Sequence, residues 1–143
     1  MGFNFKLTRK MNFGSIRLAI KTNHSKTNNF KYAFNIPKYK IEFVGNTKLS
    51  KNIFFNWEIN YVSNRYNAFK NQFLQQNPLS ANLDYELLRN ILITNIELQY
   101  DFTDKWNVFV KGENLLGKNN YFWSNYVEQS PVILSGLRYN FNF

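Results

Sequence analysis

The sequence contains no cysteine and only one histidine, His24, and these scarcities exclude several kinds of site. Without thiolates the chain has no disulfide framework, no cysteine-ligated metal and no cysteine nucleophile. A single histidine in a predicted loop is more often a solvated residue than a metal or haem ligand. The lack of cysteine suits an envelope protein as well as a cytosolic one, so it leaves the compartment open.

Long apolar runs are missing as well. No stretch approaches the roughly 18 apolar residues that a membrane-spanning helix needs. The first residues, MGFNFKLTRKMNFG, lack the apolar run of roughly 7 to 15 residues that is typical of a signal peptide. Any contact with a membrane is therefore expected to be made by strands.

Aromatic and amide side chains are abundant, with 15 Phe, 9 Tyr, 3 Trp and 24 Asn against 6 Gly and 3 Pro. Such a composition favours strands that have one apolar and one polar face. The net charge is +9, but the Lys and Arg residues are scattered singly and form no basic tail. At 143 residues the chain has the length of one ordinary domain.

Apolar and polar residues alternate along most of the chain. In NIFFNWEINYVS, for example, one face carries Ile53, Phe55, Trp57, Ile59 and Tyr61. The same period predicts strands near residues 2 to 9, 13 to 22, 37 to 46, 52 to 64, 88 to 100, 105 to 114 and 131 to 143. No helix is expected. The predicted fold is all-β, an antiparallel up-and-down meander of about seven strands.

Three tight turns, in RKMN, NTKLS and DFTDK, join these strands into hairpins. The expected cross-strand partners on the apolar face are Leu7 with Ile16, Ile41 with Trp57 and Leu98 with Val108. On the polar face the same registers set Lys40 opposite Glu58 and Lys6 opposite Arg17. The last of these pairs is unfavourable, because it opposes two like charges.

Short and long connections alternate strictly, with long links near residues 23 to 36, 65 to 87 and 115 to 130. Tight turns at one end and long polar loops at the other are typical of an outer-membrane barrel with a periplasmic and an extracellular end. Rings near the strand ends suit the two membrane interfaces. They are Tyr100, Trp106, Phe141 and Phe143 at the short-turn end, and Tyr39 and Tyr61 at the long-loop end.

An odd number of strands has a further implication. Bacterial single-chain barrels have even strand numbers, because an open edge leaves backbone groups unpaired in hydrocarbon at several kcal/mol each. We therefore expect residues 1 to 143 to be the C-terminal piece of a larger transmembrane barrel, with Met1 an internal or secondary start.

Two segments carry a family resemblance. FNIPKYKIEFVGNTKLSKNIFFNWEINYVSNRY, and LQYDFTDKWNVFVKGENLLGKNNYFWSNY with the later GLRYNF, resemble the last strands of TonB-dependent outer-membrane receptors. The resemblance implies part of a transporter that imports an iron chelate, haem, cobalamin or a glycan. It implies contact with outer-membrane lipid, the barrel-insertion machinery and, through N-terminal parts of the parent, the TonB complex. No cofactor, enzymatic activity or nucleic acid is implied.

The family also has a signal peptide and a globular plug, and neither has a counterpart in this chain, so transport by this chain alone is not expected. By resemblance, the terminal signal read by the insertion machinery is Gly136, Tyr139, Phe141 and Phe143. The faces predict lipid contact for Ile53, Phe55, Trp57, Ile59, Leu98, Val108 and Val110. They predict lumen-facing charges at Lys40, Glu42, Glu58, Glu97, Lys111 and Glu113.

Several of these residues have a second interpretation. Two lumen carboxylates can serve as acid and base, although pairing with lumen Lys and Arg is far more common. Aromatic residues of the long loops either contact a ligand or pack the loops together: Tyr66, Phe69, Tyr121, Trp123 and Tyr126. Two other functions remain open, a complete small barrel acting as an adhesin or lipid-modifying enzyme, and a soluble basic β-protein that binds nucleic acid.

Overall fold

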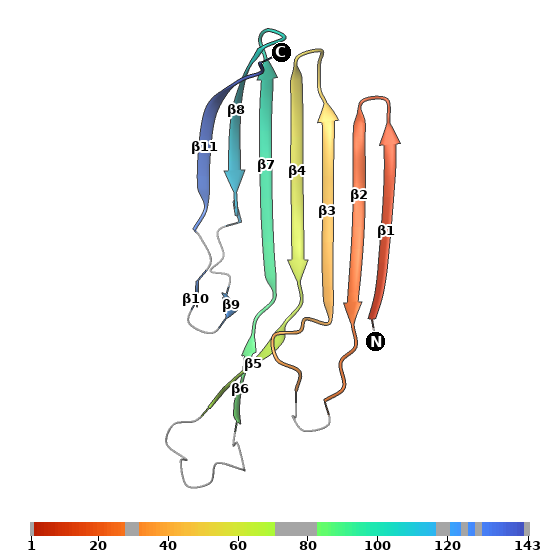
Figure 1. Ribbon diagram of the computed structural model, residues 1–143, viewed down its shortest axis with the longest axis vertical. Coiled ribbons are helices and arrows are strands. Elements are labelled where there is room, and N and C mark those ends of the chain that lie inside the picture. The colour runs from red at the N-terminus through yellow and green to blue at the C-terminus, as the bar shows by residue number, and fades with distance from the viewer. Residues whose placement is uncertain are drawn as a thin grey trace.

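The computed structural model describes residues 2–27, 32–70, 83–116, 121–123, 126–127 and 130–141. Its main feature is one antiparallel sheet with the strand order β1-β2-β3-β4-β7-β8-β11 (Figure 1). The strands are β1 (Gly2–Met11), β2 (Gly14–Asn23), β3 (Tyr39–Lys48), β4 (Ile53–Val62), β7 (Ile91–Asp101), β8 (Trp106–Glu113) and β11 (Val132–Tyr139). The described residues contain no helix. The predicted all-β meander is confirmed.

The connections are sorted between the two ends of the sheet, as the sequence predicts. Residues 12–13, 49–52 and 102–105 make the short links between β1 and β2, β3 and β4, and β7 and β8. Figure 1 shows these three turns at one end, the longer connections at the other, and the two chain termini at opposite ends. Each strand of the main sheet therefore has one end at the short turns and the other end at the longer connections.

Two of the long connections contain strands that the sequence pattern did not predict. A hairpin of β5 (Arg65–Lys70) and β6 (Leu83–Leu88) lies in the segment expected to be a loop. A smaller pair, β9 (Tyr121–Trp123) and β10 (Tyr126–Val127), lies in the next long connection. These strands have only 6, 6, 3 and 2 residues, so alternation has too little length to mark them as it marks the main strands.

The three predicted hairpin registers are wrong, by two residues between β1 and β2 and between β7 and β8, and by four residues between β3 and β4. Leu7 lies opposite Leu18, Ile41 opposite Tyr61, and Leu98 opposite Val110. Each turn comes later in the chain than expected, so every strand keeps its partner but slides along it. Because side chains alternate with a period of two, a shift by an even number of residues leaves both faces unchanged. The predicted faces of the strands are therefore correct although the predicted registers are not.

The fit between Gly45 and Trp57 gives a physical reason for the observed register of β3 and β4. These residues are direct partners, and a Cβ atom at Gly45 would lie 2.3 Å from the indole ring. The ring therefore covers the glycine, a pairing that compensates for the missing side chain. Phe43 packs edge-on against the same indole, with ring centroids 4.6 Å apart.

The corrected registers also change the charged pairs. Lys6 lies opposite Ala19, so the expected contact with Arg17 does not form. Lys40 lies opposite Val62, not Glu58, and its partner on the other side is Lys21. One predicted like-charge pair is thus removed, and an unpredicted one is created.

The sheet is a single layer without a conventional core. Among the described residues only two hydrophobic side chains are buried, Leu88 and Ile91. The accessible surface is 11178 Å², against about 7,700 Å² expected for a compact monomer of this mass. Most apolar side chains of the sheet are therefore not buried against another layer of the structure.

The final strand is shorter than predicted. β11 ends at Tyr139, and the backbone N–H of Asn140 donates to the carbonyl of Lys105 at 2.8 Å, which continues the contact with the preceding turn. Phe141 is described and exposed, whereas Phe143 lies outside the described residues.

Candidate functional site

One face of the main sheet, called the apolar face below, carries all seven residues predicted to contact lipid. Ile53, Phe55, Trp57 and Ile59 of β4 share it with Leu98 of β7 and with Val108 and Val110 of β8. Leu98 and Val110 are direct partners and remain 48% and 49% exposed. Packing within the sheet thus covers only about half of each side chain.

The apolar face continues to both edges of the sheet. On β1 it presents Phe3, Phe5 and Leu7, and on β11 it presents Ile133 and Leu137, all of them exposed. The only charged side chain that the described main strands place on this face is Arg9, near the short-turn end of β1. A few Thr and Ser residues also lie on it, but a largely apolar surface of this width is unusual for a protein surface in water.

A row of aromatic rings borders the apolar face at the short-turn end. Phe102 stacks on Trp106 with centroids 6.4 Å apart, Trp106 contacts Tyr139 at 4.7 Å, and Tyr139 contacts Phe141 at 4.5 Å. Tyr139 and Trp106 are also direct cross-strand partners. At the long-connection end the same face carries Tyr39 and Tyr61.

Gly136, the first residue of the predicted terminal signal, lies on the opposite face from Tyr139. The Phe109 ring of β8 packs directly against Gly136, and a Cβ atom at this position would lie 2.9 Å from that ring. The guanidinium of Arg138 lies over the other part of the ring, 4.3 Å from its centroid. The glycine therefore has a local packing role, which the sequence motif did not indicate.

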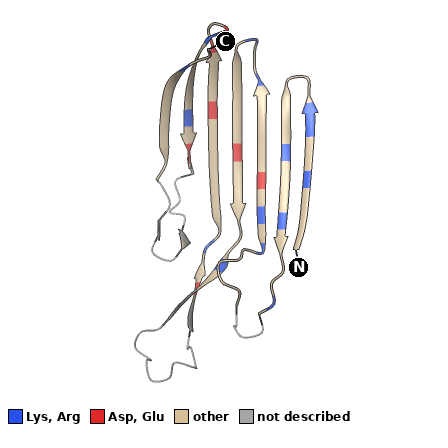
Figure 2. Cartoon of the chain, viewed as in Figure 1, with Lys and Arg blue, Asp and Glu red and all other residues tan. Residues whose placement is uncertain are grey.

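The second face, called the polar face below, carries the six predicted lumen charges. Figure 2 shows Lys and Arg concentrated on β1 to β3 and acidic residues on the central strands. Two of the six charges pair with each other, Lys111 with Glu113 at 2.6 Å. Arg17 forms an ion pair with Glu42, and Arg138 pairs with Glu97 at 3.3 Å. The carboxylates at positions 42, 97 and 113 are thus engaged by cations.

Glu58 is bound by amides. Its two carboxylate oxygens accept hydrogen bonds from the side-chain nitrogens of Asn60, at 2.7 Å, and Asn95, at 3.2 Å. The Asn95 side-chain oxygen in turn accepts the backbone N–H of Asn114 at 3.0 Å. Asn114 has a positive φ of 49°, a left-handed conformation that asparagine tolerates at a strand end. Asn60 and Asn95 were not predicted as partners of Glu58, because nothing in the local pattern links residues 58 and 95.

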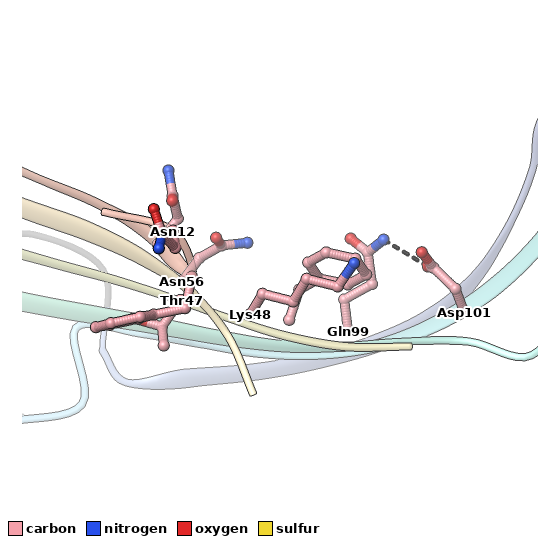
Figure 3. Close-up of a pocket in the computed structure, with 10 residues that line it drawn as sticks. Asn12, Thr47, Lys48, Asn56, Gln99 and Asp101 are labelled. Carbon is pink, nitrogen blue, oxygen red and sulfur yellow. Dashed lines mark hydrogen bonds between the residues drawn. The ribbon is translucent and has the colours of Figure 1, made fainter. Parts of the chain in front are cut away.

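A hollow of about 430 Å³ lies on the polar face near the short-turn end. Figure 3 shows six of its lining residues: Asn12, Thr47, Lys48, Asn56, Gln99 and Asp101. The Gln99 amide donates to the Asp101 carboxylate at 2.8 Å, and the Lys48 ammonium lies 5.5 Å from the centre of the Phe54 ring. The hollow therefore offers both hydrogen-bond donors and hydrogen-bond acceptors. The described residues contain no group of three or more side chains that could hold a metal ion.

Two long connections are joined at the other end of the sheet by Arg65, which is 3% exposed. Its Nε donates to the side-chain oxygen of Asn35 at 2.6 Å, and Nη1 donates to the Arg89 carbonyl at 3.3 Å. Burial lowers the pKa of the Arg65 guanidinium. The ring of Tyr66, the next residue along the chain, stacks on that of Tyr32 with centroids 3.8 Å apart.

The aromatic residues predicted in the long loops are therefore only partly placed. Tyr66 packs on Tyr32, and Trp123 is 55% exposed. The side chains of Phe69, Tyr121 and Tyr126 lie outside the described part of the structure. His24 directly follows β2 and is exposed.

The sequence matches no protein-family model, and no curated protein matches it. In the described part of the chain there is no helix long and apolar enough to cross a membrane.

Proposed function

We propose that this chain is a seven-stranded part of an outer-membrane β-barrel of the TonB-dependent receptor type, which takes up a nutrient. In this proposal the apolar face contacts lipid and the polar face lines the interior. The short turns lie at the periplasmic end, and the long connections lie at the cell surface.

The exposed apolar face is the observation that carries the membrane proposal. Its side chains run from β1 to β11, and those of Phe3, Leu98 and Leu137 are 62%, 48% and 66% exposed. In water such a surface promotes aggregation, whereas in a bilayer it is solvated by lipid. The charged side chains of the same strands, apart from Arg9, lie on the other face.

Strand length and ring placement support the same conclusion. About 9 to 11 residues cross a bilayer as a tilted strand. β1 to β4 have 10 residues each and β7 has 11, whereas β8 and β11 have 8 each. Trp106 and Tyr139 lie near the short-turn ends of their strands, and Tyr39 and Tyr61 lie near the opposite ends. In the proposed membrane these two ends of the strands lie at the two membrane–water interfaces, where Trp and Tyr rings are favoured.

The edges of the sheet support a larger barrel. In the described structure β1 pairs only with β2, and β11 pairs only with β8. Further strands would satisfy the outward-facing N–H and C=O groups, which in hydrocarbon cost several kcal/mol each if left unpaired. A complete small barrel has less support, since it would need β1 and β11 to meet.

The receptor family is proposed from the sequence resemblance alone. It adds a plug and a TonB contact in other parts of the protein, recognition of the terminal strand by the insertion machinery, and an iron chelate, haem, cobalamin or glycan as cargo. A soluble nucleic-acid-binding protein has less support, because binding of single strands combines rings and cations on one surface. Here most rings of the main sheet and nearly all its cations lie on opposite faces.

Depth-dependent quenching of tryptophan fluorescence by brominated lipids tests the membrane proposal. Three variants of the protein in vesicles each keep one of Trp57, Trp106 and Trp123, with the others changed to Phe. We expect Trp57, in the middle of β4, to be quenched best by deep bromines and Trp106 by shallow ones. Trp123, in the β9–β10 connection, should be quenched little. Equal quenching of Trp57 and Trp123 would contradict the proposal.

The coding sequence upstream of the Met1 codon tests the receptor family. An open frame that encodes further alternating strands and a plug is expected. A signal peptide directly before Met1, followed by this chain alone, would favour a small barrel instead.

A further inference from the structure

Lys21 and Lys40 face each other across β2 and β3 on the polar face. Both side chains are exposed, and in the described part of the chain neither takes part in an ion pair. Directly opposed residues of neighbouring strands have Cβ atoms about 4.5 to 5.5 Å apart, and like charges in that position destabilise the sheet. Both strands are internal to the sheet, so neither lysine lies at a frayed edge.

The nearest carboxylate on this part of the face does not compensate for the two lysines. Glu42, two residues beyond Lys40 on β3, forms its ion pair with Arg17 of β2. Lys6 of β1 lies in the same cross-strand row as Glu42, opposite Ala19, and adds a further positive charge. This corner of the sheet therefore has an excess of cations, which is visible in Figure 2.

A hollow of about 400 Å³ lies beside the two lysines. Its polar lining includes Asn4, Lys21, Lys40, Glu42 and Asn60, and its apolar lining includes Val62 and Ile93. The Glu42 carboxylate in this lining is the one already paired with Arg17. Val62 and Ile93 contribute an apolar wall. The volume is within the range of small-molecule sites, which usually combine apolar walls with a few well-placed polar groups.

We infer that this hollow binds a small organic anion, with a carboxylate or phosphate head between Lys21 and Lys40 and an apolar body against Val62 and Ile93. An anion between the two ammonium groups turns their repulsion into two charge-assisted contacts. The inference rests on the proposed function, because the polar face would line the path of the cargo. It narrows that cargo to solutes with an anionic head.

Protection of lysines from acetylation tests the inference. The full chain, folded in detergent micelles, is treated with an acetylating reagent, and each lysine is followed by mass spectrometry. We expect benzoate to slow the reaction of Lys21 and Lys40 at least threefold and to leave Lys10 and Lys48 unchanged. Those two lysines lie on the same face at the short-turn end and serve as internal controls.

Further probes define the chemistry. Benzyl alcohol, a neutral analogue of benzoate, should protect no lysine, and phenyl phosphate distinguishes a phosphate head from a carboxylate head. Lys40→Gln should abolish the protection of Lys21, and Lys40→Met repeats the test with a side chain of similar length. Because either change removes a like-charge contact, neither is expected to impair folding.

Two results would overturn the anion site. One is equal protection of all four lysines, which would indicate general charge screening. The other is no protection by either anion in protein that shows heat-modifiable gel mobility. Neither result bears on the quenching of Trp57 by deep bromines, so the membrane proposal would stand or fail separately.

Discussion

Placing a positive charge on adjacent residues of β4 should separate the two faces sharply. Trp57 points to the apolar face and Asn56 to the polar one. Trp57→Arg puts a guanidinium near mid-depth in the proposed membrane, where it costs about 2 to 4 kcal/mol. The change also removes the edge-on contact with Phe43, at 4.6 Å between centroids, which adds about 0.5 to 1.5 kcal/mol.

The expected destabilisation for Trp57→Arg is therefore about 2.5 to 5.5 kcal/mol by these two contributions. Asn56→Arg should change the free energy of unfolding by less than about 1 kcal/mol, because it introduces a cation opposite Glu97, as an exposed ion pair would. Trp57→Phe is the control for loss of the indole without added charge. It should cost less than the arginine variant.

Urea titration of the protein in lipid vesicles, followed by heat-modifiable gel mobility, measures these differences without relying on tryptophan fluorescence. The expected order of stability is wild type and Asn56→Arg together, then Trp57→Phe, then Trp57→Arg. Equal stability of the two arginine variants would refute the assignment of lipid to the apolar face. Greater loss from Asn56→Arg would mean that the faces are reversed.

Three further predictions concern other parts of the sheet. Gly136→Ala should destabilise the protein by about 1 to 3 kcal/mol through overpacking, and should cost less in a Phe109→Leu background; equal unfolding midpoint shifts in both backgrounds would exclude the packing role. Phe141→Ala should reduce surface-labelled protein in cells far more than it reduces refolding yield in detergent, with Asn140→Ala changing neither; parallel losses in the two assays would point to packing instead of recognition by the insertion machinery. Arg65→Met removes charge-assisted hydrogen bonds worth about 1.5 to 3 kcal/mol each. Limited proteolysis should therefore cut residues 32–38 faster, while the gel mobility of the main sheet stays unchanged. An unchanged cleavage rate would show that Arg65 does not hold the connection.

The alternation of residue types determined the strands and their faces without any knowledge of the fold. In β4 the sequence separates Ile53, Phe55, Trp57 and Ile59 from their polar neighbours, and a strand can only place successive side chains on opposite sides. The sorting of short and long connections also followed from the sequence, because tight links between neighbouring strands leave antiparallel hairpins as the simplest arrangement. These features are local, so a local pattern is enough to predict them.

Register and long-range partners were decided only by the tertiary structure. A slide by an even number of residues conserves both faces, so alternation cannot detect it. The fit of Trp57 over Gly45 becomes visible only when the two strands are aligned. The link from Arg65 to Asn35 and the opposition of Lys21 to Lys40 join segments separated by long connections. Such contacts depend on where each connection returns the chain to the sheet, which residue types alone do not specify.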